Sequence, residues 1–347
     1  MLDLLLYKII VKMKGILIVN LGTPDSPTTK DVKSYLGEFL MDGYVIDMPY
    51  LARLLLVKGI ILNTRPKQSA AAYQKIWSDK GSPLMYHTVD LVKKVQALVD
   101  VPVEMGMRYN KPSINTSLQN LKNKGCTDIF VIPLYPQYAM SSFTTVVEKV
   151  KKEAGKIDSS IKLDFIDPFY KEENFIKLWS DKIKAEKEKS GAEYILFSYH
   201  SIPVNHLEKS DCTGVHCNKV DNCCEVKSKA HDTCYKHQCI ETTKAIVKNL
   251  GLKPEEYEIA YQSKLGRKEW LTPATANRID ELPQEGKKNI MVVIPSFVSD
   301  CLETIEEIGM EGRECFMEHG GEKYHRVDCL NSDDNWANVL ADWIKNN

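Results

Sequence analysis

Short apolar runs alternate with longer stretches of helical spacing along most of this chain. The first run, residues 15–21 (GILIVNL), is apolar on both faces, as a central strand of a parallel sheet is when helices cover both of its sides. Similar runs rich in β-branched residues predict seven further strands. They lie at residues 101–105, 129–134, 161–166, 194–197, 258–262, 290–294 and 325–328.

Apolar residues at helical spacing occupy the stretches between many of these strands. They predict helices at residues 31–40, 66–76, 87–99, 113–124 and 175–189, and a closing helix that ends at Trp343. This alternation of strands and helices is typical of a doubly wound α/β fold, in which a parallel sheet is flanked by helices.

The chain also contains an internal similarity. Residues 128–136 and 289–297 each form an apolar strand that a proline ends and that a loop follows. The similarity predicts two α/β halves that face one cleft, an N-terminal half at residues 14–168 and a C-terminal half at residues 169–347. Ligands of open α/β sheets bind at the carboxyl ends of the strands, so we expect the functional residues there.

One apolar stretch, residues 51–62, has two interpretations. It contains two cations, Arg53 and Lys58, among leucines, isoleucines and valine. A buried helix is one interpretation. The other is an exposed apolar lip for a flat hydrophobic ligand or for a membrane surface.

Composition and charge bear on three questions: whether the chain binds nucleic acid, whether it spans a membrane and whether it is secreted. The 347 residues are 43% hydrophobic with a net charge of −1, which gives no indication of a nucleic-acid partner. No apolar run reaches the roughly 18 residues that a membrane-spanning helix needs. The N-terminal stretch 1–11 carries Lys8 and lacks a small-residue cleavage site, so we expect no signal peptide and a cytoplasmic protein. Met13 is an alternative start.

Two candidate sites for metal or proton chemistry lie at predicted strand ends. His200 ends the apolar run 194–197 and its extension, shortly before Pro203. Asp300 and Glu303 follow the strand 290–294 and are three residues apart, which places them on one helical face. A structural histidine and two helix-capping carboxylates are the plainer alternative. Together, an imidazole and two carboxylates suit a divalent ion and a proton acceptor at neutral pH.

Six of the ten cysteines lie within residues 212–239. In a chain without a secretory signal, such clustering favours a metal site over disulfides. The other four, at positions 126, 301, 315 and 329, are scattered, and we expect them to be buried.

Eight short motifs occur in the order found in ferrochelatases, and the chain resembles that family from about residue 14 onward. They are Leu21-Gly22-Thr23-Pro24, Gly81-Ser82-Pro83-Leu84, Gly106-Met107-Arg108-Tyr109, Leu134-Tyr135-Pro136-Gln137-Tyr138, Tyr199-His200-Ser201-Ile202-Pro203, Gln262-Ser263-Lys264-Leu265-Gly266-Arg267, Trp270-Leu271 and Asp300-Cys301-Leu302-Glu303-Thr304. The resemblance implies two Rossmann-like halves with the active site between them. It also implies insertion of Fe(II) into protoporphyrin IX, the last step of protohaem synthesis.

The resemblance assigns roles to several residues. His200 and Glu303 become the central pair at the substrate iron, with Asp300 beside them as a third catalytic residue. Arg65 and Arg108 are expected near the porphyrin propionates, because arginine pairs with carboxylates through two hydrogen bonds. The remaining expected pocket residues are Leu21, Tyr73, Tyr109, Tyr135, Tyr138 and Trp270. The apolar lip is expected at a membrane interface, the inner face of the membrane for a cytoplasmic protein.

Relative to the simpler family pattern, about 22 residues, roughly 212–233, are added here. The chain therefore resembles the bacterial type whose [2Fe–2S] cluster is held by an internal cysteine-rich segment. Such a cluster needs four thiolates. Our candidates are Cys212, Cys217, Cys224 and Cys234, with Cys223 and Cys239 as alternates. Zinc, with His216, His231 or His237 nearby, and a disulfide-linked segment are the alternatives.

Other functions remain open at the level of the sequence. A related chelatase could metallate coproporphyrin or load cobalt. A non-catalytic haem or iron–sulfur sensor would explain the cysteines but would not need His200 and Glu303 together, and a zinc-ribbon interaction module would explain the basic character of residues 219–236. The sequence does not indicate the oligomeric state.

Overall fold

Two parallel sheets of four strands each organise the chain in this computed structural model, which describes residues 13–264, 266 and 268–347. The first contains β1 (Met13–Asn20), β2 (Val103–Met107), β3 (Cys126–Pro133) and β4 (Lys162–Phe165). The second contains β5 (Tyr194–His200), β6 (Tyr257–Gln262), β7 (Asn289–Val293) and β8 (Lys323–Arg326). All eight predicted strands are therefore confirmed, and the two sheets lie on either side of residue 168.

The sheets share one topology. Their strand orders are β2-β1-β3-β4 and β6-β5-β7-β8, so the first strand of each half lies inside its sheet and the second lies at an edge. The register pairs Ile16 with Val103 in the first sheet and Phe197 with Ile259 in the second. β3 and β7, which contain the similar sequences, occupy the same position in their sheets. This arrangement confirms the prediction of two similar α/β halves.

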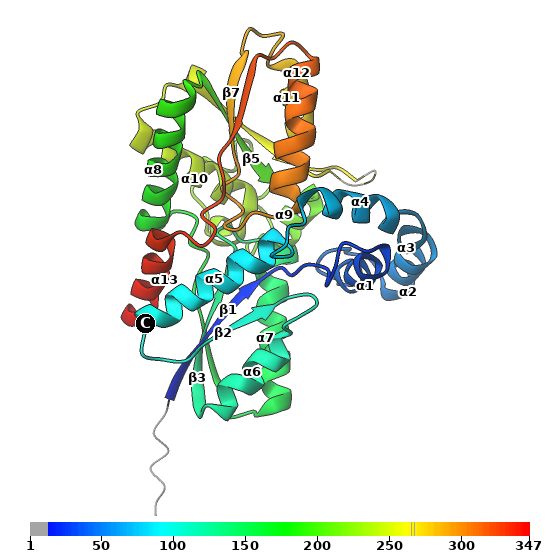
Figure 1. Ribbon diagram of the computed structural model, residues 1–347, viewed down its shortest axis with the longest axis vertical. Coiled ribbons are helices and arrows are strands. Elements are labelled where there is room, and N and C mark those ends of the chain that lie inside the picture. The colour runs from blue at the N-terminus through cyan, green and yellow to red at the C-terminus, as the bar shows by residue number, and fades with distance from the viewer. Residues whose placement is uncertain (1–12, 265, 267) are drawn as a thin grey trace, which may run out of the picture.

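Helices cover both sheets (Figure 1). The α-helices are α1 (Thr29–Leu40), α2 (Tyr50–Leu54), α3 (Leu62–Thr64), α4 (Pro66–Ile76), α5 (Pro83–Leu98), α6 (Ile114–Asn123), α7 (Thr145–Ile157), α8 (Glu173–Ser190), α9 (Val204–Ser210), α10 (Tyr235–Leu250), α11 (Thr275–Glu281), α12 (Gly312–Glu318) and α13 (Asp334–Asn346). Three π-helical stretches, η1 (Leu55–Ile61), η2 (Met140–Thr144) and η5 (Glu303–Glu311), lead directly into α3, α7 and α12, and two short 3₁₀ turns are η3 (Lys229–Thr233) and η4 (Pro254–Glu256).

Local sequence signals set several helix ends. The Thr28 hydroxyl accepts a hydrogen bond from the Asp31 amide at the start of α1, and Ser113 does the same for α6. Gly191 follows the last residue of α8 and Gly251 that of α10, both with φ near +65°, a conformation that glycine adopts without steric cost. No helix among the described residues is long and apolar enough to cross a membrane.

The two halves share one hydrophobic core. A single cluster extends from Ile16 of β1 through Phe197 of β5 to Trp336 of α13. The C-terminal helix α13 packs against α5 as well as α8, so the end of the chain returns to the N-terminal half (Figure 1). Smaller clusters cover the opposite face of each sheet. The shared core fixes the sheets relative to each other and thereby fixes the site between them.

Candidate active site

His200 is the last residue of β5 and is half-buried. Its Nδ1 lies 2.6 Å from the Ser201 carbonyl oxygen, and its backbone amide donates to the Ser296 hydroxyl at 3.4 Å. A carbonyl can only accept a hydrogen bond, so Nδ1 must carry the hydrogen. Nε2 then keeps its lone pair, which makes it the atom of this ring that can accept a proton or bind a metal ion.

Glu303 and Glu307 lie on η5, which follows the loop after β7. Burial raises the pKa of Glu307, and the nearby Glu303 carboxylate raises it further, whereas the Ser263 hydroxyl and His200 act in the opposite direction. Ser263 Oγ donates to Glu307 Oε2 at 2.5 Å, and Gln262 Nε2 donates to the Glu303 carbonyl at 3.2 Å. Glu307 therefore lies beside both members of the predicted central pair, although no sequence motif had indicated it.

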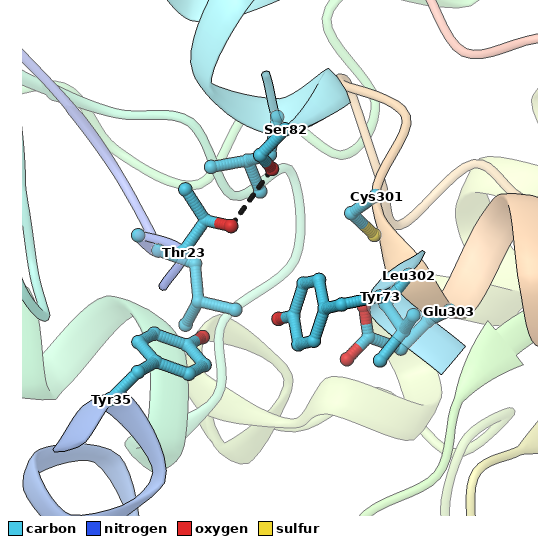
Figure 2. A pocket seen from close by; sticks show the side chains of 10 residues that line it. Thr23, Tyr35, Tyr73, Ser82, Cys301, Leu302 and Glu303 are labelled. Carbon is cyan, nitrogen blue, oxygen red and sulfur yellow. Dashed lines mark hydrogen bonds between the residues drawn. The ribbon is translucent and has the colours of Figure 1, made fainter. Parts of the chain in front are cut away.

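A small pocket opens between the halves (Figure 2). Its N-terminal wall comes from the loop after β1, from α1 and α4, and from the start of α5, and its C-terminal wall comes from the start of η5. The lining residues are Leu21, Gly22, Thr23, Tyr35, Tyr73, Ser82, Leu84, Cys301, Leu302 and Glu303. The Glu303 carboxylate lies next to the Tyr73 ring, and the hydroxyls of Tyr35 and Tyr73 point toward each other (Figure 2). The cleft predicted between the halves is thus present.

Gly22 shows how closely the N-terminal wall is packed. Its φ of +108° suits glycine, and a Cβ at this position would lie 1.9 Å from the Tyr109 carbonyl oxygen. The Tyr109 amide in turn donates to the Leu21 carbonyl at 2.9 Å. Two of the eight motifs, Leu21–Pro24 and Gly106–Tyr109, therefore touch each other through their backbones.

Contacts between α4 and η5 hold the two walls of the pocket together. Lys75 Nζ forms an ion pair with Glu306 Oε1 at 2.6 Å, and Glu306 is nearly buried. Tyr73 packs in the same hydrophobic cluster as Leu302 and Ile305. The helix with the pocket tyrosine and the helix with the catalytic candidate Glu303 are therefore linked by both an ion pair and apolar contacts.

Asp300 is only 3% exposed and is surrounded by hydrogen-bond donors. Arg326 Nη1 donates to Oδ1 at 2.6 Å, Thr304 Oγ1 donates to Oδ1 at 2.8 Å, and Asn331 Nδ2 donates to Oδ2 at 2.7 Å. Burial alone would raise the pKa of Asp300, but the Arg326 guanidinium and these hydrogen bonds hold it below its usual range. The carboxylate thus stays ionised within a closed network.

Arg108 and Tyr109 converge on a buried carboxylate, Asp42. The Arg108 Nη2 group pairs with Asp42 Oδ2, and the Tyr109 hydroxyl donates to the same oxygen at 2.8 Å. Arg108 Nε also donates to the Thr145 hydroxyl at 2.7 Å. Tyr135 is close enough for Arg108 to lower the pKa of its hydroxyl, although burial raises that pKa more. This group forms a second, largely occupied polar cluster beside the pocket.

Tyr35 connects the pocket with this second cluster. Burial raises the pKa of its hydroxyl, and Tyr73, Glu303, Tyr109 and Tyr135 all add to the rise. Tyr35 was absent from our candidate residues, although its place on the inner face of the helix predicted at 31–40 was a usable signal. Asp42 was also absent, and no local signal indicated it.

Three predicted residues lie outside these groups. Arg65 is exposed at the start of α4. The Tyr138 hydroxyl accepts a hydrogen bond from Thr144 at 2.7 Å. Trp270 pairs with Pro203 through a β-bridge and borders a different hollow, which also contains Asn218 and Lys236 of the cysteine-rich segment.

Residues 51–62 form α2, η1 and the start of α3, and several of their apolar side chains are exposed. Leu51 is 70% and Leu55 72% exposed, whereas Val57 is buried against Leu40. The stretch is therefore an exposed apolar lip that is attached to the rest of the protein through the buried Val57. Of the two interpretations of the sequence, the exposed lip corresponds to the structure and the fully buried helix does not. α1 to α4 lie together as one group that projects to one side of the two sheets (Figure 1).

The cysteine-rich segment brings several thiols close to one another. The Cys234 thiol lies near both Cys217 and Cys224, and Cys223 lies near Cys224, because each of these pairs influences the pKa of a member thiol. Burial raises the pKa of Cys217 to about 11. Cys239 is buried against Tyr235, and Cys212 donates toward the Lys229 carbonyl at 3.6 Å.

Three imidazoles of this segment contact backbone carbonyls of its adjacent cysteine pair, Cys223 and Cys224. His216 Nε2 and His231 Nε2 contact the Cys223 carbonyl at 2.7 and 2.9 Å, and His237 Nδ1 contacts the Cys224 carbonyl at 2.9 Å. The rings of His231 and His237 stack at 3.6 Å. The histidines therefore fix the backbone of the adjacent cysteine pair.

Comparison with known proteins gives a consistent result. Residues 13–347 match the family model described as ferrochelatase. A ferrochelatase of Stutzerimonas stutzeri is 41% identical over 94% of this chain and 96% of its own length, and one of Coxiella burnetii is 40% identical over 95% and 93%. Among solved structures, SirB from Bacillus subtilis with Fe³⁺ is similar in fold, with a TM-score of 0.55 and 12% identity over 96% of this chain and 94% of its own.

Proposed function

The chain belongs to the ferrochelatase family and inserts Fe(II) into protoporphyrin in haem biosynthesis, and on this premise we propose that His200 and Glu303 carry out the metallation. The observation that supports these two residues most directly is their common neighbour Glu307, whose pKa responds to both of them. They come from different strand ends of the C-terminal half, and Glu303 lines the pocket that the N-terminal half closes.

The reaction exchanges one Fe²⁺ for two pyrrole N–H protons, so the site needs proton acceptors near the ring. His200 Nε2 offers a lone pair, because Nδ1 is held by the Ser201 carbonyl. Glu303 provides an oxygen ligand that can replace water on the incoming iron. A positioned base of this kind contributes roughly 10²–10⁴-fold to a rate.

We assign to Glu307 the second proton transfer, in which it accepts a proton that His200 or Glu303 has taken from the porphyrin. Its raised pKa gives it a higher proton affinity than an ordinary glutamate, and Ser263 holds its carboxylate in place. A proton taken up near the macrocycle can therefore pass from the central pair to Glu307 and away from the iron.

For Asp300 we propose a positioning role. Its two oxygens already accept hydrogen bonds from Arg326, Thr304 and Asn331, so it has little capacity left for iron or a substrate proton. The network holds the first residues of η5 and with them Glu303. Asp300 thus holds the Glu303 carboxylate in position without touching the substrate.

The two arginines expected at the propionates differ in availability. Arg65 is exposed at the start of α4, near the apolar lip, and we propose that it binds a propionate. Arg108 pairs with Asp42 and donates to Thr145, so its contribution is to order Tyr109 and Tyr135 in the pocket wall. The exposed Leu51 and Leu55 suit contact with a membrane surface from which the apolar substrate enters.

We further propose that the cysteine-rich segment holds a [2Fe–2S] cluster through Cys217, Cys224 and Cys234, with the fourth ligand from Cys212 or Cys223. Among the described residues, no three of these thiols lie within 4.8 Å of one another, although Cys234 contacts two of them. A tetrahedral zinc site needs all its sulfurs about 3.8 Å apart. A two-iron cluster divides four thiolates into two pairs, which the pairwise contacts fit better. When bound, it would supply one-electron redox chemistry.

The test of the catalytic proposal is metallation with prebound porphyrin. We expect His200→Ala and Glu303→Gln to bind protoporphyrin with nearly unchanged affinity, measured by fluorescence quenching, and to lose roughly 10²–10⁴-fold in the rate of haem formation after anaerobic addition of Fe(II). Preserved turnover in His200→Ala, or loss of porphyrin binding with normal turnover of bound substrate, would refute the assignment.

A further inference from the structure

Asp280, Cys315 and His319 lie together on the outer side of the C-terminal half, away from the groups assigned above. Asp280 belongs to α11, Cys315 to α12, and His319 follows the last residue of α12. The two helices pack side by side (Figure 1). In the part of the chain that the structure describes, these are the only three histidine, cysteine or carboxylate residues whose donor atoms all lie within 4.8 Å of one another.

The distances among the three donor atoms are close to those around a bound ion. Cys315 Sγ lies 2.8 Å from Asp280 Oδ1, His319 Nδ1 lies 3.7 Å from the same oxygen, and Sγ and Nδ1 are 3.9 Å apart. A tetrahedral Zn²⁺ with ordinary Zn–S, Zn–N and Zn–O bonds places such atoms about 3.3–3.6 Å apart. Side-chain adjustments of less than about 1 Å therefore produce the required geometry.

His319 can give up its present hydrogen bond and bind a metal ion without leaving a buried polar group unpaired. Its Nδ1 donates to the Cys315 carbonyl at 2.8 Å. If Nδ1 binds a metal, its hydrogen moves to Nε2, which water can satisfy because the side chain is 39% exposed. The Cys315 carbonyl still receives the His319 backbone amide at 3.1 Å, so no buried group loses its last hydrogen bond.

We propose that Asp280, Cys315 and His319 bind one divalent metal ion of borderline softness, of which Zn²⁺ fits best, with the fourth position taken by water. The thiol proton leaves to solvent as the metal–thiolate bond forms. Because α12 continues directly from η5, the ion would fasten α11 to the far end of the helix that carries Glu303 and Glu307. This site is separate from the substrate iron and from the cysteine-rich segment.

The experiment must distinguish Cys315 from the nine other cysteines. We would measure the rate at which iodoacetamide alkylates Cys315 in the full-length protein, resolved by mass spectrometry of the peptide that contains it, with increasing Zn²⁺. We expect Zn²⁺ to protect Cys315, EDTA to reverse the protection, and the hard cation Mg²⁺ to have no effect.

Variants locate the ligands. His319→Gln and Asp280→Asn should raise the Zn²⁺ concentration that half-protects Cys315 by more than about tenfold, the lower limit seen even when an outer-shell partner is removed. Glu314→Gln, which changes an exposed carboxylate on the same helix, should leave that concentration unchanged. Equal alkylation of Cys315 with and without Zn²⁺, or unchanged protection in His319→Gln, would overturn the proposal. The side chains of His319 and Asp280 are both partly exposed, so these variants should fold.

Discussion

Replacing Asp300 with asparagine tests whether this residue stabilises the site or takes part in the reaction. The substitution Asp300→Asn keeps the size of the side chain and removes its charge. The Arg326 guanidinium, which is 17% exposed, would lose its buried partner and keep, among the residues that the structure describes, the ion pair with Asp328, whose side chain is 64% exposed. The NH₂ group of the new asparagine would also point its hydrogens at groups that already donate to this position, which are Arg326, Thr304 and Asn331.

Removing one member of a buried ion pair costs about 3–5 kcal/mol, because the other charge stays buried without compensation. Asp328 compensates part of that charge, so we expect the lower end, a loss of about 3 kcal/mol in the free energy of unfolding. The exposed pair with Asp328 is worth about 1 kcal/mol or less, so Asp328→Asn is the matched control.

The assay is urea unfolding of wild type, Asp300→Asn and Asp328→Asn, with the midpoint and slope compared. The pKa of Asp300 is lower in the folded state than its usual value of about 3.9, so protonation favours unfolding. The stabilisation is therefore fully present above about pH 4 and is lost as the pH falls further. The difference between wild type and Asp300→Asn should stay constant from neutral pH down to that point and then shrink.

A different outcome would refute this reasoning. If Asp300→Asn unfolded within about 1 kcal/mol of wild type while haem formation fell by roughly 10²-fold or more, Asp300 would be a catalytic proton acceptor and not a positioning residue. The positioning role would be supported by a different result. In that case Asp300→Asn would be less stable than wild type, but its rate of haem formation would return toward the wild-type rate at urea concentrations well below its unfolding midpoint.

Three further predictions concern the other proposals. Glu307→Gln should lower the rate of metallation by roughly 10²-fold and make the decline of the rate in acid less steep, because the raised pKa leaves Glu307 protonated and unable to accept there; an unchanged pH–rate profile would contradict its role. Leu55→Asp should weaken sedimentation with anionic vesicles by about tenfold or more, whereas Val215→Asp, at a similarly exposed apolar position on the cysteine-rich segment, should not. Cys234→Ser should abolish the visible absorption of anaerobically purified protein, and a colourless wild type would contradict the cluster.

The strands could be predicted because a buried parallel strand needs an apolar residue at almost every position. The helices were harder to predict. α10 was missed although Ile246 and Val247 face the core, because its first two turns contain Tyr235 and Cys239, which we interpreted only as part of the cysteine-rich segment. α7 and α11 were missed as well. α7 does bury Val146 and Val150 on one face, whereas α11 has only seven residues and buries Thr275 and Ile279 alone, too few for a helical pattern.

For the site, the sequence indicated residues at strand ends and missed residues that depend on tertiary contacts. His200 and Glu303 follow predicted strands, so topology alone placed them in one half. Asp300 was interpreted with Glu303 because the two are three residues apart. Its partners Arg326 and Asn331 lie at the end of β8 and after it, beyond η5 and α12, and only the folded chain brings them to Asp300. Asp42 illustrates the same limit, because its partner Arg108 is 66 residues away.

The repeated topology also explains why the two halves contribute differently to the site. β1 and β5 occupy the same position in their sheets, so the residues after them face the same cleft. After β1 the chain continues with Gly22, which packs its backbone against Tyr109 and leaves room for nothing larger. After β5 it continues from His200, whose ring remains half-buried with one nitrogen free. One half thus supplies a closely packed wall with aromatic residues from α1 and α4, and the other supplies His200 and Glu303, to which we assign the proton exchange. A flat ring held against that wall would lie beside Glu303, the carboxylate that the C-terminal half places in the same pocket.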